Sequence, residues 1–224
     1  MAAGQVSDAV GNSNVASTST DNSVTYDTAI PTSVSLAQAA GQADPTNASP
    51  ISFALTANED LNGATVTSAD FTATNGTIAS IACAGGACAI TVTASAQGAV
   101  TIAPSGSFSV ADVAGNASTT TVAGSDRSVT YDSIAPTVTL QQASGQVDPT
   151  KVSSIQFTLT ANEPLDPASV TLADFTATNG TVASVTGSGD TYTVMVTATG
   201  QGAVVVAPSG TFAVSDPAGN QTTT

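Results

Sequence analysis

Carboxylates are the side chains in this sequence whose number and spacing could do chemistry. The chain carries 16 Asp and Glu against two Lys and Arg, and with no His its formal net charge is −14. Carboxylate oxygens are hard ligands, and Ca²⁺ takes about six to eight oxygens in a protein site. The other interpretation is that these residues close turns by bonding their own backbone. The positions in question are Asp27, Asp44, Glu59, Asp112, Asp132, Glu163 and Asp216.

Two cysteines form the second group that could react. Cys83 and Cys88 stand on either side of the tetrapeptide Ala-Gly-Gly-Ala, and their spacing from Ile81 and Ile90 places both on one side of adjacent strands. We expect a disulfide across this hairpin, which suits an exported protein. Two buried, reduced thiols are the alternative. A zinc site is disfavoured because the chain has two cysteines and no histidine.

The composition excludes several classes of function. A nucleic-acid binder needs a basic surface, and Arg127 and Lys151 are the only basic side chains. Without histidine, neither imidazole acid–base catalysis nor a Ser-His or Cys-His pair is available, so we expect no enzyme activity. No apolar run approaches the roughly 20 residues of a transmembrane helix, so we expect no membrane insertion by this segment.

Internal repetition organises the rest of the sequence. Three stretches recur at a spacing of 104 residues, and the sequence around Asp8 is a third copy of the one around Asp112 and Asp216. The pentapeptide SVTYD occurs at 23–27 and again at 128–132. The matched stretches are TANEDL (56–61) with TANEPL (160–165), ADFTATNGT (69–77) with the same letters at 173–181, and QGAVTIAPSGSFSVADVAGN (97–116) with QGAVVVAPSGTFAVSDPAGN (201–220).

We divide the chain according to this repetition. Residues 1–27 are the final strand and linker of a preceding repeat, or a donor strand. Residues 28–131 are the first repeat, and residues 132–224 are the second repeat without its last strand. Such a chain is either a window of a longer array or a subunit whose spare N-terminal strand, residues 13–27, completes the second repeat of another copy.

Apolar residues alternate with polar ones within each repeat, as Ile51, Phe53 and Leu55 illustrate. This period of two is typical of half-buried strands, and the Asn-Gly pair in TNGT is typical of tight turns. Short strands in units of about 100 residues predict an all-β fold of tandem antiparallel two-sheet sandwiches with roughly seven strands each. The strands expected in the first repeat are 32–38, 51–57, 70–74, 77–84, 87–95, 99–111 and 117–130.

These motifs are similar to those of the tandem bacterial immunoglobulin-like domains found in large surface adhesins and biofilm-associated proteins. The resemblance implies immunoglobulin-like sandwiches that act as extenders and hold a distal binding domain away from the cell. It also implies Ca²⁺ at domain junctions, because several relatives bind the ion there and are stiffened by it. It covers nearly the whole chain and rests on VTYDSIAPTVTL (129–140), TANEPL (160–165), DFTATNGTV (174–182), GSGDTYTVMVTA (187–198) and SDPAGN (215–220).

The sandwich topology predicts where the acidic residues meet. With strands running in alternating directions, the loop after the second strand, the turn after the sixth and the entering linker lie at one end of a repeat. The loop after the first strand lies at the other end. The junction between the two repeats should therefore combine Asp44, Asp132, Glu163 and Asp216. The corresponding positions ahead of the first repeat are Asp27, Glu59 and Asp112.

We expect a non-enzymatic extender or stalk module of a bacterial cell-surface adhesin or of an exported filament, in an extracellular location. Its partners are then neighbouring Ig-like repeats, or further copies of the same chain joined head to tail by strand donation. The alternative is an adhesin domain whose loops bind a carbohydrate or a protein. The acidic surface repels anionic partners such as nucleic acid.

Overall fold

The computed structural model describes residues 1–21, 23–119, 122–124 and 126–223, and their fold is all-β with antiparallel sheets. The longest helix in the described part has three residues, too short for a transmembrane span. The strands are β1 (Val34–Gln38), β2 (Ile51–Ala57), β3 (Phe71–Thr74), β4 (Gly76–Ala84), β5 (Ala87–Ala94), β6 (Gly98–Pro104), β7 (Val110–Ala111), β8 (Ala117–Ser118), β9 (Ser128–Tyr131), β10 (Val138–Gln142), β11 (Ser154–Leu165), β12 (Phe175–Thr178), β13 (Gly180–Ala198), β14 (Val205–Pro208), β15 (Ala213–Ser215) and β16 (Gln221–Thr223). The 3₁₀ helices are η1 (Gly63–Thr65), η2 (Ser68–Asp70), η3 (Pro167–Ser169) and η4 (Leu172–Asp174).

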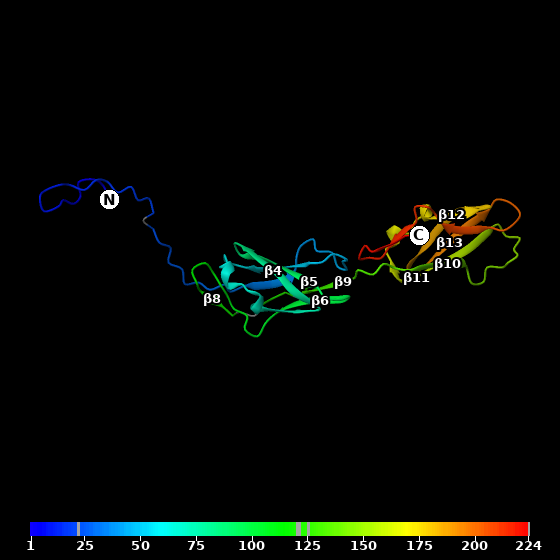
Figure 1. The fold of residues 1–224 in the computed structure, drawn as a ribbon, viewed down its shortest axis with the longest axis horizontal. Coiled ribbons are helices and arrows are strands. Elements are labelled where there is room, and N and C mark those ends of the chain that lie inside the picture. The colour runs from blue at the N-terminus through cyan, green and yellow to red at the C-terminus, as the bar shows by residue number, and fades with distance from the viewer. Residues whose placement is uncertain (22, 120–121, 125, 224) are drawn as a thin grey trace.

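The first repeat is built around one core to which two sheets contribute. One sheet has the order β1-β2-β5-β4 and the other the order β3-β6-β9, and both lie in the middle of Figure 1. Phe53 from β2 and Val100 from β6 belong to the same buried cluster. The alternation of the sequence fixes this register, because a slip by one residue would turn every apolar side chain outward.

The second repeat uses the same registers 104 residues later. Val138 pairs with Ala161 between β10 and β11, as Val34 pairs with Ala57 between β1 and β2. β13 covers the residues that correspond to β4 and β5, and its sheet has the order β10-β11-β13. β12 pairs with β14, and β15 pairs with β16. A second buried cluster, which shares no residue with the first, forms the core here.

One expected strand is interrupted by proline. The strand expected at 99–111 divides into β6, which ends at Pro104, and the short β7. Proline has no N–H to donate to a ladder, so the pairing cannot continue through it. The residues that follow close a turn in which Phe108 N donates to Ser105 O at 3.2 Å. The prediction of one long strand is therefore wrong at this position.

The strand expected at 117–130 is not continuous either. β8 pairs with β7, Ala123 forms a parallel bridge to Ser35 of β1, and β9 then pairs with β6; residues 120, 121 and 125 lie outside the described part. Gly124 permits this crossing, because a Cβ there would lie 2.1 Å from the carbonyl oxygen of Leu36. The chain changes its partner strand within a segment that its periodicity predicts to be one strand.

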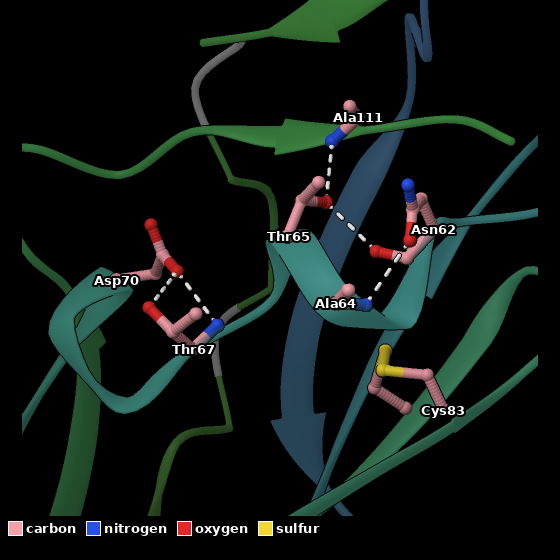
Figure 2. Close-up of a disulfide and its surroundings, with 8 residues drawn as sticks. Asn62, Ala64, Thr65, Thr67, Asp70, Cys83 and Ala111 are labelled. Carbon is pink, nitrogen blue, oxygen red and sulfur yellow. Dashed lines mark hydrogen bonds between the residues drawn. A yellow bond between two sulfur atoms is a disulfide. The ribbon is translucent and has the colours of Figure 1, made fainter. Parts of the chain in front are cut away.

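Buried aspartates fix the 3₁₀ turns ahead of β3 and β12. Asp70 Oδ2 accepts hydrogen bonds from the N and the Oγ1 of Thr67, both at 2.8 Å, as Figure 2 shows. Asp174 and Thr171 repeat the arrangement, with both distances at 2.7 Å. A carboxylate and a hydroxyl in this capping arrangement satisfy backbone donors that a short helix leaves open.

A cross-link at the β4–β5 hairpin in the first repeat is replaced by an aromatic contact in the second. Cys83 and Cys88 face each other across β4 and β5 and form a disulfide, close to the η1 turn in Figure 2. In the second repeat Gly187 and Tyr192 stand at these positions, and Tyr192 is buried. A Cβ on Gly187 would lie 2.8 Å from the Tyr192 ring. An aromatic side chain packed over a strand glycine is a known stabilising pair.

Residues 1–27 belong to neither core and extend from the end of the first repeat in Figure 1. Ser7 and Ser13 form an antiparallel bridge, which closes a small turn. Within SVTYD, Val24 is 96% exposed and Tyr26 is 89% exposed. Apolar side chains are therefore held in solvent in this segment, although the same letters at 128–132 form part of the first core.

Candidate metal centre at the junction

Three carboxylates converge where the chain passes from the first repeat to the second. One oxygen each from Asp132, Glu163 and Asp216 all lie within 4.8 Å of one another. Asp132 belongs to the linker after β9, Glu163 to the end of β11, and Asp216 to the turn after β15. We call these three residues the junction cluster. Three separate segments of the chain thus bring negative charge to one point.

The turn after β15 holds Asp216 through its partner Asn220. Asn220 donates its backbone N to Oδ1 at 3.0 Å and its Nδ2 to Oδ2 at 2.8 Å. The same clasp joins Asp112 to Asn116 in the first repeat. There the hydrogen bond from the Asn116 side chain lowers the pKa of Asp112. The ionised carboxylate is therefore the form that closes this turn, because its hydrogen bonds favour the charged state.

Glu163 contributes an oxygen that has no partner of its own. Its Oε1 is buried and accepts no hydrogen bond from any described residue. Burial raises the pKa of Glu163, and the negative charges of Asp132 and Asp216 raise it further. Loss of water and the approach of like charges both disfavour an ionised carboxyl group. A cation bound between the three carboxylates would reverse the second effect and give Oε1 a partner.

The first repeat positions Asp132 through the backbone. Asp132 N donates to Thr46 O at 2.9 Å, and the Asp132 carbonyl oxygen accepts from Nδ2 of Asn220 at 2.9 Å. The next residue, Ser133, exchanges two hydrogen bonds of 3.1 Å with the side chain of Gln97. The linker is thus hydrogen-bonded to the first repeat on one side and to the second repeat on the other.

Two further contacts close the joint. Asn162, next to Glu163, accepts from Thr137 N at 2.6 Å and donates its own N to Thr137 O at 3.1 Å. This pins the end of the linker to β11. Gly219 lies against the loop after β1, because a Cβ there would be 3.6 Å from Nδ2 of Asn47. The two repeats therefore touch directly as well as through the linker.

The donor set of the junction cluster suits a hard divalent cation. All its candidate ligands are carboxylate oxygens, the chain has no histidine, and the described cysteines are both oxidised. Ca²⁺ binds about six to eight oxygens and accepts waters and carbonyls among them, so three carboxylates leave the remaining positions to these. The unpartnered Oε1 of Glu163 fits such a ligand role. A softer metal that prefers sulfur or imidazole does not fit this set.

The remaining predicted ligands do not join the junction cluster. Asp44 Oδ1 accepts a hydrogen bond from Thr130 N at 2.9 Å, so this carboxylate fixes β9 within the first repeat. Asp27, Glu59 and Asp112 form no comparable group of three within the described residues. Glu59 nevertheless resembles Glu163 in one respect, because its Oε2 is also buried without a hydrogen-bond partner among the described residues.

The two ends of the first repeat differ in what holds the linker. Asn116 donates its Nδ2 to the carbonyl oxygen of Asp27 at 3.2 Å, as Asn220 does to Asp132. Asp27 is exposed, however, and no described residue bonds its N as Thr46 bonds that of Asp132. The convergence of the carboxylates is therefore seen at the end where two repeats meet.

Sequence reasoning named the acids of the joint but not the amides that position them. Asn162, Asn220 and Gln97 were read as parts of repeated motifs without a role of their own. The signal was nevertheless present, because the asparagines recur at the same places in the TANE and AGN motifs of both repeats. Asn58 bonds the N atoms of Thr32 and Ser33 ahead of β1, as Asn162 bonds Thr137 ahead of β10.

Comparison with known proteins finds one solved structure to report. The chain is similar to the Yersinia pseudotuberculosis adhesin InvE at 14% sequence identity and a TM-score of 0.28, over 84% of this chain and 56% of that one. This chain thus spans little more than half of that chain, and a TM-score this low establishes no common fold. No protein-family model and no curated protein matches the sequence. The proposals below therefore depend on the residues alone.

Proposed function

We propose that this chain is a non-enzymatic structural extender: tandem immunoglobulin-like sandwiches that form part of a bacterial surface adhesin or an exported filament. The single observation that carries the proposal is the joint itself. The linker is hydrogen-bonded to Thr46 and Gln97 of the first repeat and to Asn220 of the second. A linker that only connected independent domains would not need bonds to both neighbours.

The repeated cores support the same proposal. Each repeat buries its own apolar residues, with registers that recur at a spacing of 104 residues. In such arrays stability comes from the units and from their nearest-neighbour interfaces, so units can be added in line without a new core. We take residues 28–131 and 132–224 as the two units and residues 1–27 as the end of a preceding unit.

We further propose that Ca²⁺ occupies the junction cluster and stiffens the joint. Asp132, Glu163 and Asp216 would hold the ion, and the ion would supply positive charge that offsets their mutual repulsion. Because Asp132 lies in the linker and the other two in the second repeat, a shared cation would fix the angle between them. Extracellular modules bind Ca²⁺ with Kd values of roughly 10⁻⁴–10⁻³ M, which suits an exported protein. The disulfide at Cys83 and Cys88 also suits that location.

The test compares melting and joint flexibility with and without Ca²⁺. At ~10 mM Ca²⁺ a Kd of ~10⁻⁴–10⁻³ M stabilises the folded state by about 1.4–2.7 kcal/mol. We expect Ca²⁺ to raise the melting temperature of the wild-type chain above that in a chelator. Fluorescence energy transfer between dyes placed on the two repeats should show a narrower distance distribution with Ca²⁺.

Matched variants make this test specific. Asp132→Asn with Glu163→Gln removes two carboxylates of the junction cluster, and Asp27→Asn with Glu59→Gln makes the same changes ahead of the first repeat, where no cluster forms. The first double variant should lose the response to Ca²⁺, whereas the second should keep it. An identical response in all three proteins would overturn the metal site. A broad distance distribution in Ca²⁺ for the wild-type chain would overturn the stiff extender.

A further inference from the structure

The last strand of the first repeat fills a groove between two segments. β9 pairs with β6, with Val129 opposite Val100 and Thr130 opposite Ala99. On its other side Thr46 N donates to Thr130 O at 2.9 Å, so the loop after β1 forms the second wall. Val129 at the centre of the strand is completely buried. β9 therefore completes both the sheet and the core.

The corresponding place in the second repeat is open within the described residues. β14 pairs only with β12 there, whereas β6 pairs with both β3 and β9. A groove of about 900 Å³ lies beside it, and its walls include Asp148, Thr150 and Val204. These three residues are the counterparts of Asp44, Thr46 and Val100, which surround β9 in the first repeat.

The open groove leaves core residues partly exposed. Ile51, Phe53 and Val100 are 0% exposed in the first repeat. Their counterparts Ile155, Phe157 and Val204 are only half-buried, and the neighbouring Val205 is 53% exposed. An unpaired strand edge beside exposed apolar side chains is a template for another strand. The groove thus has both the hydrogen-bonding edge and the apolar floor of a strand-binding site.

The chain also carries a copy of the strand that fits this site. The pentapeptide SVTYD of 128–132, which includes most of β9, occurs a second time at 23–27. Val24 is the counterpart of the buried Val129, yet it stands in solvent. Asp27 is tied to Asn116 at the end of the first repeat remote from β9, so residues 23–27 and the groove lie toward opposite ends of the molecule in Figure 1.

We propose that residues 23–27 of a second copy of this chain bind in the groove of the second repeat, antiparallel to β14. The register of β9 places Val24 opposite Val204 and Thr25 opposite Ala203. The Asp148 carboxylate then accepts from Thr25 N, as Asp44 accepts from Thr130 N in the first repeat. Because donor and groove lie at opposite ends, the contact joins copies head to tail and does not close on itself.

This inference names a partner for the proposed extender and rests on that function, but it does not depend on metal. A chain that stays monomeric at every concentration would overturn the strand donation. It would leave the stiffness of the internal joint, which is measured within one chain, untouched.

Sedimentation of the full chain over a range of concentrations tests the proposal. We expect assemblies that grow with concentration. Val24→Asp should weaken the association by at least about tenfold, since it replaces a buried apolar side chain with a charge. Val24 is 96% exposed in the single chain, so the change cannot unfold either repeat. Val15→Asp, at a position 85% exposed in the same segment, is the matched control and should assemble like the wild type.

Cross-linking tests the register. Thr130 and Ala99 face each other as a pair whose backbone groups point away from one another, since the Thr130 backbone bonds Asp44 and Thr46. Such pairs have close Cα atoms and accept a disulfide. Thr25→Cys with Ala203→Cys should therefore give a ladder of covalent multimers under oxidation, and Val15→Cys with Ala203→Cys should not. Equal ladders from both, equal assembly of all variants, or disulfides formed only within one chain would each overturn the proposal.

Discussion

The Glu163→Gln substitution should change stability in opposite directions depending on whether Ca²⁺ is present. Without metal, Glu163 faces two carboxylates with oxygens within 4.8 Å. At that distance two like charges repel by ~0.9 kcal/mol in a water-like medium and ~3.5 kcal/mol at an effective dielectric constant of about 20. The joint is partly exposed, so we take the lower figure for each pair. Removing the charge of Glu163 should then stabilise the metal-free protein by about 2 kcal/mol.

Thermal melting in a chelator measures this gain. For a unit of about 60–100 residues, 1 kcal/mol shifts the melting temperature by about 4–8 °C, so Glu163→Gln should raise the transition of the second repeat by roughly 10 °C. In saturating Ca²⁺ the order should reverse, because the wild-type protein gains a ligand bond that the amide supplies only weakly. Glu59→Gln is the control, since Glu59 also has a buried unpartnered oxygen but belongs to no cluster.

The reasoning fails if Glu163→Gln lowers the melting temperature equally in chelator and in Ca²⁺. That result would mean that the carboxylate is a structural group whose negative charge the fold needs. It also fails if Glu59→Gln shows the same stabilisation in chelator, because the gain would then come from burial alone and not from repulsion within the junction cluster.

Two further predictions concern the same joint. In a chelator the second repeat should become more stable as the pH falls from 7 toward 4.5, because a carboxyl group with a raised pKa takes up its proton in the folded state first; a pH series of melting curves on the wild type and on Glu163→Gln, which should lack the slope, checks this. Asn220→Ala should cost about 2–3 kcal/mol in urea unfolding, since it removes hydrogen bonds to the Asp216 carboxylate and to the linker. Asn116→Ala should cost less, because the linker carbonyl of Asp27 that it releases is exposed and can bond water.

The repeated letters made most of the fold predictable from the sequence. A period of two fixes which side of a strand is buried, and the recurrence at 104 residues makes each register visible twice, as Val34↔Ala57 and Val138↔Ala161 show. The strand ends were predicted less well, because Pro104 and Gly124 act through the backbone and not through the apolar pattern. Proline ends the β6 ladder, and glycine allows the close passage over Leu36.

The junction was predictable in part for a similar reason. Alternating strand directions suffice to bring Asp132, Glu163 and Asp216 to one end of the second repeat. They do not show whether a carboxylate is already satisfied by a nearby backbone N–H. Asp44 is satisfied in this way by Thr130, and so it stays out of the group. A local hydrogen bond of this kind depends on side-chain geometry that the sequence alone does not reveal.

The internal joint and the proposed contact between copies are built from the same letters, which couples the two proposals. A copy whose residues 23–27 fill the groove would present Asp27 beside Thr150, as Asp132 lies beside Thr46 in the internal joint. The backbone of Asp27 would then be fixed from both sides, since Asn116 already donates to it. Asp27, Glu59 and Asp112 would meet as the junction cluster does, and assembled chains should bind twice as much Ca²⁺ per chain as the Val24→Asp variant. Equal binding by both in calorimetry would mean that strand donation does not rebuild the joint.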